Sequence, residues 1–169
     1  GATMIRQTFS QFGDKVTLRI ASGRSGLTTS FEFPYEDTHV NVMVSDIGDN
    51  ANFGSERISS EADRTILKNA DGVMIVNWAS NLQGTELAEF TFKNSPSAFH
   101  FISPADFETR KHDFRDSLAK LASLTDCLSM NENECNSLAD AFGFGRPLGP
   151  SYSADEVKEV AKRIAERVG

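Results

Sequence analysis

The stretch Cys127-Leu128-Ser129-Met130, followed by Asn131-Glu132-Asn133-Glu134, shows the pattern that decides the fold: an apolar run that ends in a polar cluster. The pattern occurs three more times. The other runs are Val40–Val44, Gly72–Val76 and Ala98–Ile102, and their clusters begin at Ser45, Asn77 and Ser103. Because helix-like segments separate the runs, they predict four parallel strands in βαβ units, near residues 40–45, 72–77, 97–102 and 127–130. The carboxyl ends of such strands meet at one edge of the sheet, where ligands bind, so this edge is the candidate active site.

The segments between the runs have the apolar spacing of amphipathic helices. Helices are predicted at residues 60–69, 85–93, 106–122 and 132–143, and from Ser153 to the end of the sequence. The third helix carries one apolar stripe, made of Phe107, Phe114, Leu118 and Leu121. Ser153 and Glu156 have the spacing of a capping box, which predicts where the last helix begins. Since no strand follows this last amphipathic helix, we expect the chain to be a segment of a larger sheet.

The first third of the chain differs in character from the rest. Polar and apolar residues alternate in Lys15–Ala21 and, less cleanly, in Leu27–Phe33, and a glycine-containing turn separates the two stretches. This pattern predicts an antiparallel hairpin that Pro34 brings to an end. We therefore expect residues 1–37 to form a hairpin that serves as a lid or a sheet edge, and residues 38–169 to form a parallel α/β core.

Composition excludes several classes of function. The chain has 169 residues, of which 39% are hydrophobic and 24% charged, as in ordinary globular domains. The net charge of −7, with no run of Lys or Arg, disfavours nucleic-acid and anionic membrane partners. No apolar stretch approaches the ~20 residues that span a bilayer. The two cysteines, Cys127 and Cys135, lie in no CxxC motif, which favours reduced thiols in a cytoplasmic protein.

Asn131 and Glu134 are the leading candidates for a cofactor site. They lie three residues apart at the start of a predicted helix, so they share one face. Backbone donors at a helix start favour phosphate, and carboxylate and amide oxygens suit a hydrated Mg²⁺. The alternative is an N-cap asparagine followed by acidic residues that complement the helix dipole.

The other polar clusters supply candidate substrate contacts. Asp46 could bind a sugar hydroxyl or a cation, and an Asx-turn with Gly48 at positive φ explains the same residues. Asn77 and Asn81 flank Trp78, an arrangement that suits a hydroxylated ligand and is equally consistent with packing and capping. His100 lies within an apolar run and is predicted to be a core or interface histidine with its hydrogen bonds satisfied.

Three stretches, in this order, resemble the ribokinase-like (PfkB) carbohydrate kinase family. They are residues 69–77, residues 101–106 with Arg110, and residues 125–134. In the last stretch, Asn131 and Glu134 occupy the Asn-x-x-Glu motif, which in the family helps to organise Mg²⁺ and phosphate. Ser103 stands where the family often has Asp. The resemblance implies a partial three-layer α/β/α sandwich, with the hairpin as part of a small β lid over the sugar.

The resemblance also implies an activity. ATP would be the phosphoryl donor, and a hydroxyl of a carbohydrate or nucleoside the acceptor, with Mg²⁺ as the cation. The N-terminal Gly-Gly motif and the C-terminal Gly-Ala-Gly-Asp motif are absent from the sequence, so the catalytic residue is expected beyond Gly169 and this chain alone is expected to be inactive. A homodimer is compatible with this interpretation. The alternatives are a noncatalytic α/β ligand-binding or protein-interaction module, in which the polar strand ends are caps and turns, and a small nucleotide-binding domain of another family.

Overall fold

The computed structural model describes residues 27–35, 38–46, 48–105 and 107–169, together with the single positions Gln7, Ser10 and Arg24. The chain divides into two compact units, residues 1–52 and residues 53–169. Each unit has its own β-sheet.

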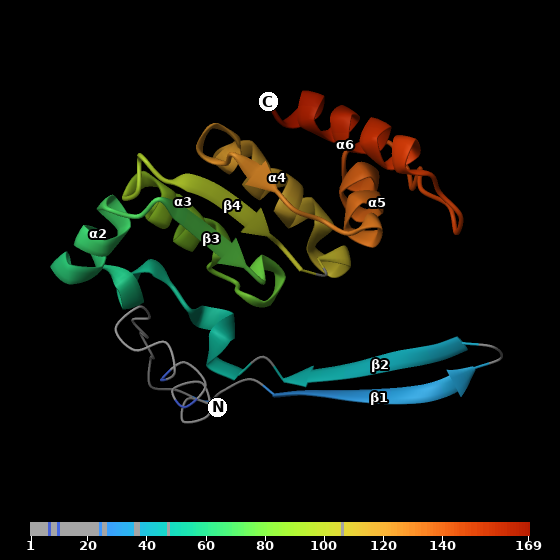
Figure 1. Cartoon of the computed structure of the whole chain (residues 1–169), viewed down its shortest axis with the longest axis horizontal. Helices are drawn as coiled ribbons and strands as arrows, with labels where there is room; N and C mark the ends of the chain where they lie inside the picture. Colours follow the sequence, from blue (N-terminus) through green and yellow to red (C-terminus); the bar gives the residue numbers. More distant parts are fainter. Residues whose placement is uncertain are drawn as a thin grey trace. The chain divides into compact units, whose positions relative to one another are not determined.

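The first unit contains an antiparallel hairpin of β1 (Leu27–Tyr35) and β2 (Thr38–Asp46) (Figure 1). The prediction that Val40–Val44 forms a parallel strand of the core is therefore wrong, because these residues pair with β1 instead. The stretch Lys15–Ala21, which was predicted to pair with Leu27–Phe33 in a hairpin, lies outside the described residues. Pro34 was expected to end a strand but lies within β1, opposite His39. Both strands of a two-stranded sheet have an open edge, where a missing N–H donor is tolerated.

The second unit is built on a parallel sheet of three strands in the order β3-β4-β5. These are β3 (Gly72–Val76), β4 (Phe99–Ser103) and β5 (Cys127–Leu128). Both pairings are parallel, with Ile75 opposite Ile102 and Ile102 opposite Leu128. Three of the four predicted core strands are thus confirmed, although β5 is shorter than the predicted 127–130.

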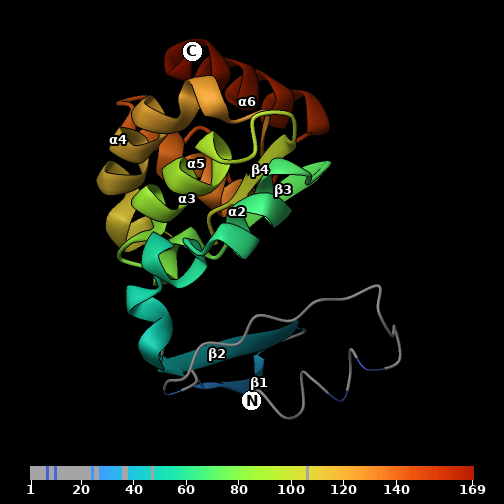
Figure 2. The ribbon, with the colours of Figure 1, turned by 90° about the vertical axis from the view of Figure 1, so that its left-hand side faces the viewer.

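Five helices accompany this sheet. They are α2 (Glu61–Lys68), α3 (Gly84–Lys93), α4 (Lys111–Leu121), α5 (Glu132–Ala141) and α6 (Ala154–Val168). Neighbours in the series from α3 to α6 pack against each other, and Figure 2 shows α3, α4 and α5 on one side of β3 and β4. The third predicted helix begins later than expected, because a short 3-10 turn at Glu108–Arg110 precedes α4. None of the helices that the described residues form has the length and apolar character needed to cross a membrane.

The hydrophobic core lies between the sheet and the helices. The sheet contributes Ile75 and Ile102, and the predicted stripe Phe107, Phe114, Leu118 and Leu121 is fully buried against them. The other face of the sheet is open, because Met74, Val76 and Phe99 are 60%, 59% and 55% exposed. The unit therefore holds the sheet and one helical layer of a partial α/β sandwich.

Candidate functional site

The carboxyl ends of β3, β4 and β5 meet at one edge of the sheet, as predicted for these three runs. The loop after β3 is tied to the end of β4, because the Asn77 N–H donates to the Ser103 carbonyl and the Ala79 N–H to the Pro104 carbonyl, both at 2.9 Å. The end of β5 is tied to β4 in the same way, since the Ser129 N–H donates to the Ile102 carbonyl at 2.9 Å. The polar residues that follow the three strands are thus held on one connected framework.

Two residues at this edge have left-handed backbone conformations that are unusual outside glycine. Asn77, directly after β3, has a φ of 60°, and Ala105, two residues after β4, has a φ of 63°. Left-handed backbone costs a residue with a Cβ roughly 1–2 kcal/mol, and asparagine tolerates it better than alanine. Such conformations concentrate at functional sites, where the surrounding structure over-determines them. The two strained residues, Asn77 and Ala105, therefore lie at the same edge of the sheet as the candidate polar residues.

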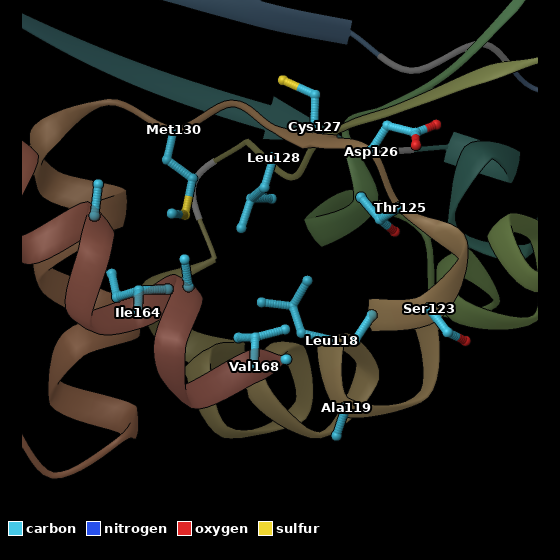
Figure 3. Close-up of a pocket in the computed structure, with 14 residues that line it drawn as sticks. Leu118, Ala119, Ser123, Thr125, Asp126, Cys127, Leu128, Met130, Ile164 and Val168 are labelled. Carbon is cyan, nitrogen blue, oxygen red and sulfur yellow. The ribbon is translucent and has the colours of Figure 1, made fainter.

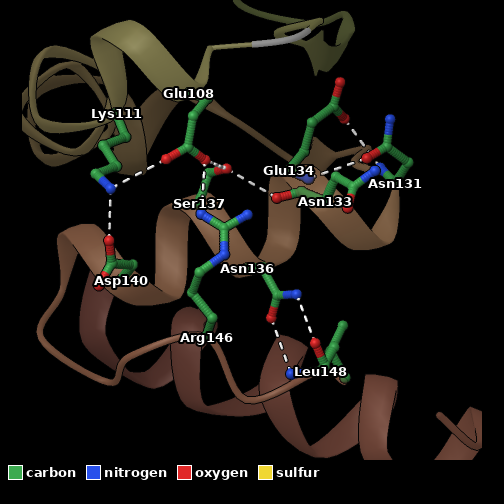
Figure 4. A network of polar contacts seen from close by, with 10 residues as sticks. All are labelled: Glu108, Lys111, Asn131, Asn133, Glu134, Asn136, Ser137, Asp140, Arg146 and Leu148. Carbon is green, nitrogen blue, oxygen red and sulfur yellow. Dashed lines mark hydrogen bonds and ion pairs between the residues drawn. The ribbon is translucent and has the colours of Figure 1, made fainter. Parts of the chain in front are cut away.

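Asn131 and Glu134 form a capping box at the start of α5 (Figure 4). The Asn131 Oδ1 accepts from the Glu134 N–H, and the Glu134 Oε2 accepts from the Asn131 N–H, both at 2.9 Å. Glu134 is only 9% exposed, yet its second oxygen, Oε1, accepts no hydrogen bond from the residues that the structure describes. The predicted cap is thus present, and it occupies one of the two carboxylate oxygens.

The described residues contain no cluster of three His, Cys, Asp or Glu side chains that could hold a metal ion. A Mg²⁺ ion commonly takes one or two carboxylates, together with substrate phosphates and waters. Among the described residues at this edge, Glu134 offers such a carboxylate oxygen, Oε1.

Asn77 and Asn81 have different environments. The Asn77 side chain is exposed, and its Oδ1 accepts from the Ser80 hydroxyl at 3.1 Å. The Asn81 amide is used at both ends: Nδ2 donates to the Phe53 carbonyl at 2.7 Å, and Oδ1 accepts from the Gln83 N–H at 2.9 Å. Asn81 therefore holds the loop after β3 in shape, while Asn77 presents an amide at the sheet edge.

Trp78 is a core residue, so packing rather than ligand contact accounts for it. Its ring is 1% exposed and lies 4.8 Å from the ring of Phe114. The indole Nε1–H donates to the Thr85 hydroxyl at 3.2 Å. The Arg110 guanidinium lies 4.3 Å from the Trp78 ring centroid, and its Nη1 donates to the carbonyls of Ala79 and Asn81 at 3.0 and 3.2 Å. Arg110 thus fastens the loop after β3 to the start of α4 through these contacts. The sequence had suggested no role for Arg110 beyond the family motif.

Asp46 belongs to the first unit, where it ends β2. Its carboxylate accepts hydrogen bonds from Arg24 and from the Gly48 N–H, the latter at 3.0 Å, and Gly48 has a φ of 62°. This is the predicted Asx-turn geometry. The Arg24 guanidinium and the Gly48 N–H lower the pKa of Asp46. Asp106, in the polar cluster after β4, lies outside the described residues.

A polar network that sequence analysis missed joins the 3-10 turn before α4 to α5 and to the loop that follows α5 (Figure 4). Glu108 accepts from the Ser137 hydroxyl, from Arg146 at 2.8 Å and from Lys111 at 3.1 Å. Lys111 also pairs with Asp140. The hydrogen bonds from Ser137, Arg146 and Lys111 lower the pKa of Glu108 to about 2. No motif signals this network, because its members are scattered over the sequence.

His100 is a satisfied core histidine, as predicted. It is buried and stacks on Phe92 with 4.3 Å between ring centroids. Its Nδ1 lies 2.7 Å from the Leu124 carbonyl, and its Nε2 lies 2.9 Å from the Ser95 carbonyl. Both nitrogens are therefore engaged within the core, near the amino end of β4.

The sequence matches no known protein-family model and no curated protein. The structure, however, is similar to the crystal structure of Anopheles gambiae adenosine kinase in complex with P1,P4-di(adenosine-5) tetraphosphate. The TM-score is 0.72 at 18% sequence identity, and the match covers 97% of this chain and 45% of that chain. This chain has the fold of part of an adenosine kinase. It spans less than half the length of that kinase, and the likeness supports the ribokinase-like resemblance at the level of the fold.

Proposed function

We propose that the chain is a segment of an ATP-dependent kinase that transfers a phosphoryl group to a hydroxyl of a carbohydrate or nucleoside. The observation that carries this proposal is the polar edge of the parallel sheet, where Asn77, Asn131 and Glu134 follow the ends of β3 and β5. Ligands of open parallel sheets bind at that edge. The fold likeness adds support, because the adenosine kinase was crystallised with an adenosine polyphosphate.

In this proposal Asn131 and Glu134 serve the nucleotide and its cation. The start of α5 carries backbone N–H donors and the positive end of the helix dipole, which favour phosphate oxygens. The Glu134 Oε1 would bind or orient a water of Mg²⁺, while Oε2 keeps the cap. Bound Mg²⁺ would neutralise charge on the phosphates. Phosphoryl transfer depends mainly on such positioning and charge neutralisation.

The substrate side of the proposal rests on the loop after β3 and on the hairpin. Asn77 offers an exposed amide for a substrate hydroxyl, whereas Asn81 would act through the shape of its loop. The hairpin of β1 and β2, with Asp46 at its end, would serve as part of a lid over the acceptor.

The decisive experiment compares the two capping boxes of this chain. Glu134 and Glu156 play the same structural role, at the starts of α5 and α6. Glutamine is also a capping-box residue, so Glu134→Gln and Glu156→Gln should both preserve the cap while removing one charge. Calorimetric titration with ATP at several Mg²⁺ concentrations should show at least a roughly tenfold loss of Mg²⁺-dependent affinity for Glu134→Gln and none for Glu156→Gln.

The noncatalytic binding module is the second candidate function, because the cap and the Asn81 amide account for most of the polar groups at the edge. If wild-type chain binds ATP with no Mg²⁺ dependence, or if the two variants behave alike, Glu134 is a cap only and this second candidate is preferred. If instead only Glu134→Gln loses Mg²⁺-dependent affinity, a panel of nucleosides and sugars added to the ATP-bound chain tests acceptor specificity.

A further inference from the structure

A polar pocket lies beside the start of α5, between this helix and the loop that leads to α6. Its volume of about 430 Å³ falls within the roughly 300–1,000 Å³ that small-molecule sites occupy. We call it the α5 pocket. Its lining comes from Glu132, Asn133 and Asn136 on the helix, and from Arg146, residues 148–150 and Tyr152 in the loop.

The α5 pocket lies on a different face of the helix from Glu134. An α-helix turns by about 100° per residue, so Glu132, Asn133 and Asn136 share one face and Glu134 lies roughly 150° away around the axis. In Figure 4 the Asn136 side chain points toward Leu148, whereas the Glu134 side chain points away from it. The pocket is therefore separate from the face of α5 that the proposed cofactor site uses.

A larger groove, of about 650 Å³, lies between α4 and α6 beneath β5 and has a different lining (Figure 3). Leu128, Met130 and Val168 point into it. Its polar residues Ser123, Thr125 and Asp126 lie along one side only. The α5 pocket, in contrast, has polar side chains on both its helix wall and its loop wall.

Buried contacts fix the loop wall of the α5 pocket. Asn136 is only 8% exposed, and its amide pairs with the backbone of Leu148: Nδ2 donates to the carbonyl at 2.8 Å, and Oδ1 accepts from the N–H at 2.9 Å (Figure 4). Arg146 is held from the other side, because its Nη1 donates to Glu108 at 2.8 Å. The walls are thus formed before a ligand arrives, which reduces the entropy cost of binding.

Several polar groups of the α5 pocket are available to a ligand. Within the described part of the chain, the Asn133 side-chain amide makes no hydrogen bond, and Ser137 bonds to its backbone carbonyl instead. The Nε and Nη2 of Arg146 likewise have no partner among the described residues. The Glu132 carboxylate accepts from the Tyr152 hydroxyl, and the N–H of Glu132 itself and this hydroxyl lower the pKa of Glu132. Glu132 is therefore an ionised acceptor at neutral pH.

The charges around the α5 pocket indicate a neutral ligand. Glu108 compensates the charge of Arg146, so Glu132 leaves the lining with a net negative charge that disfavours phosphates and carboxylates. The guanidinium of Arg146 in turn disfavours ammonium groups. A hydroxyl is the group that satisfies both kinds of partner, because it donates to Glu132 and accepts from Asn133 and Arg146.

We infer that the α5 pocket is a second ligand site, which takes a neutral polyhydroxylated molecule of the size of a monosaccharide. Glu132 would accept from its hydroxyls, and Asn133 and Arg146 would donate to them. The Tyr152 side chain, 42% exposed at the pocket, supplies an aromatic surface for the apolar C–H groups of a sugar. The inference goes beyond the proposed function, because it needs neither nucleotide nor Mg²⁺ and gives Glu134 no part.

The test is a nuclear magnetic resonance titration of the isotope-labelled full chain, without ATP, with D-ribose and D-glucose as probes. At least one of them should cause saturable shift changes of the Asn133, Gly149 and Tyr152 amides. D-ribose 5-phosphate and 1,3-diaminopropane serve as the anionic and cationic comparisons, and both should bind more weakly there than the better sugar. The Asn77 amide reports separately on the sheet edge.

Variants of the α5 pocket give the second readout. Asn133→Ala removes an amide that makes no hydrogen bond within the described chain, so it should preserve the fold and weaken sugar binding at least roughly fivefold. Glu132→Ala should weaken it as much or more. Glu159→Ala changes an exposed glutamate of α6 that does not line the pocket, and it should bind as wild type. Trp78 fluorescence checks that each variant is folded.

Four outcomes would overturn the inference. They are no saturable change with either sugar, shift changes confined to the sheet edge or to other surfaces, wild-type affinity of the Asn133→Ala variant, and equal or tighter binding of the phosphate or the diamine at the pocket amides. Loss of Mg²⁺-dependent ATP binding in Glu134→Gln has no bearing on any of them, so this inference and the proposed function can fail independently. If Glu132→Ala does not fold, Asn133→Ala and the shifts of the wild-type chain decide.

Discussion

Glu108 joins three parts of the second unit through one carboxylate. It accepts from Lys111 at the start of α4, from Ser137 on α5 and from Arg146 in the loop after α5. Because these donors favour the charged form, they lower its pKa from 4.5 to about 2. A lowered pKa in the folded state means that the contribution to stability is complete above pH 4.5 and is lost as the pH falls toward 2.

We therefore predict that Glu108→Gln lowers the free energy of unfolding at neutral pH by about 0.5–1 kcal/mol, a modest value because solvent screens this partly exposed group. The difference between variant and wild type should shrink steadily between pH 4.5 and pH 3. Urea denaturation across pH 3–7 measures it. Asp155→Asn, which removes an exposed partner of Lys158, should leave stability nearly unchanged and is the control. A difference that is constant across this pH range contradicts the pKa argument.

At the scale of single residues, local patterns were predictable and long-range partners were not. The caps at Asn131 and Ser153 and the turn at Asp46 involve residues two or three positions apart, so their spacing is visible in the sequence. The partners of Glu108 lie up to 38 positions away. Trp78 was ambiguous for the same reason, since only the fold brings Phe114 and Arg110 to its ring.

At the scale of elements, α3 begins at a glycine because its first turn packs directly on Trp78. A Cβ on Gly84 would lie 2.7 Å from the Trp78 Cδ1 and 3.1 Å from the Trp78 carbonyl oxygen. Elsewhere in a helix, replacing glycine by alanine stabilises by roughly 0.5–1 kcal/mol. At Gly84 the close approach to the Trp78 ring, which is fixed in the core, makes the same replacement destabilising.

Gly84→Ala should therefore destabilise the chain by roughly 1–3 kcal/mol, the usual cost of overpacking. Gly149→Ala is the matched control, because a Cβ at this position would have no neighbouring atom within 4 Å, and the variant should change stability by less than about 0.5 kcal/mol. Urea denaturation followed by Trp78 fluorescence measures both. Equal stability of the two variants would mean that α3 can move away from Trp78 at little cost.

Element type was easier to predict than strand partnership. The helical stripes and three core strands were evident, because their periodicity is a local property. Val40–Val44 was misplaced because a short apolar run fits a buried parallel strand and a hairpin strand equally well. Its partner decides between them, and that partner, β1, contains the Pro34 that was expected to end the strand.

At the scale of the whole molecule, the buried core cluster that the described residues form lies in the second unit, residues 53–169. Its parallel sheet is nonetheless open on the face that carries Met74, Val76 and Phe99. Parallel sheets are ordinarily covered on both faces, so this unit is one layer short of the three-layer sandwich that the resemblance implies. The open face could not be predicted from the sequence. Apolar periodicity predicts that a segment is a helix, but it does not say which face of the sheet the helix covers.

Because the core cluster lies within one unit, we predict that a fragment of residues 53–169 folds without residues 1–52. Trp78 is the single tryptophan of the chain and is 1% exposed, so its fluorescence reports on this core alone. The fragment should keep the blue-shifted emission of the full chain, and its urea midpoint should agree within the error of the measurement. Beginning the fragment at Phe53 retains the carbonyl that accepts from Asn81. Emission typical of an exposed tryptophan would show instead that the first unit is needed to hold the core together.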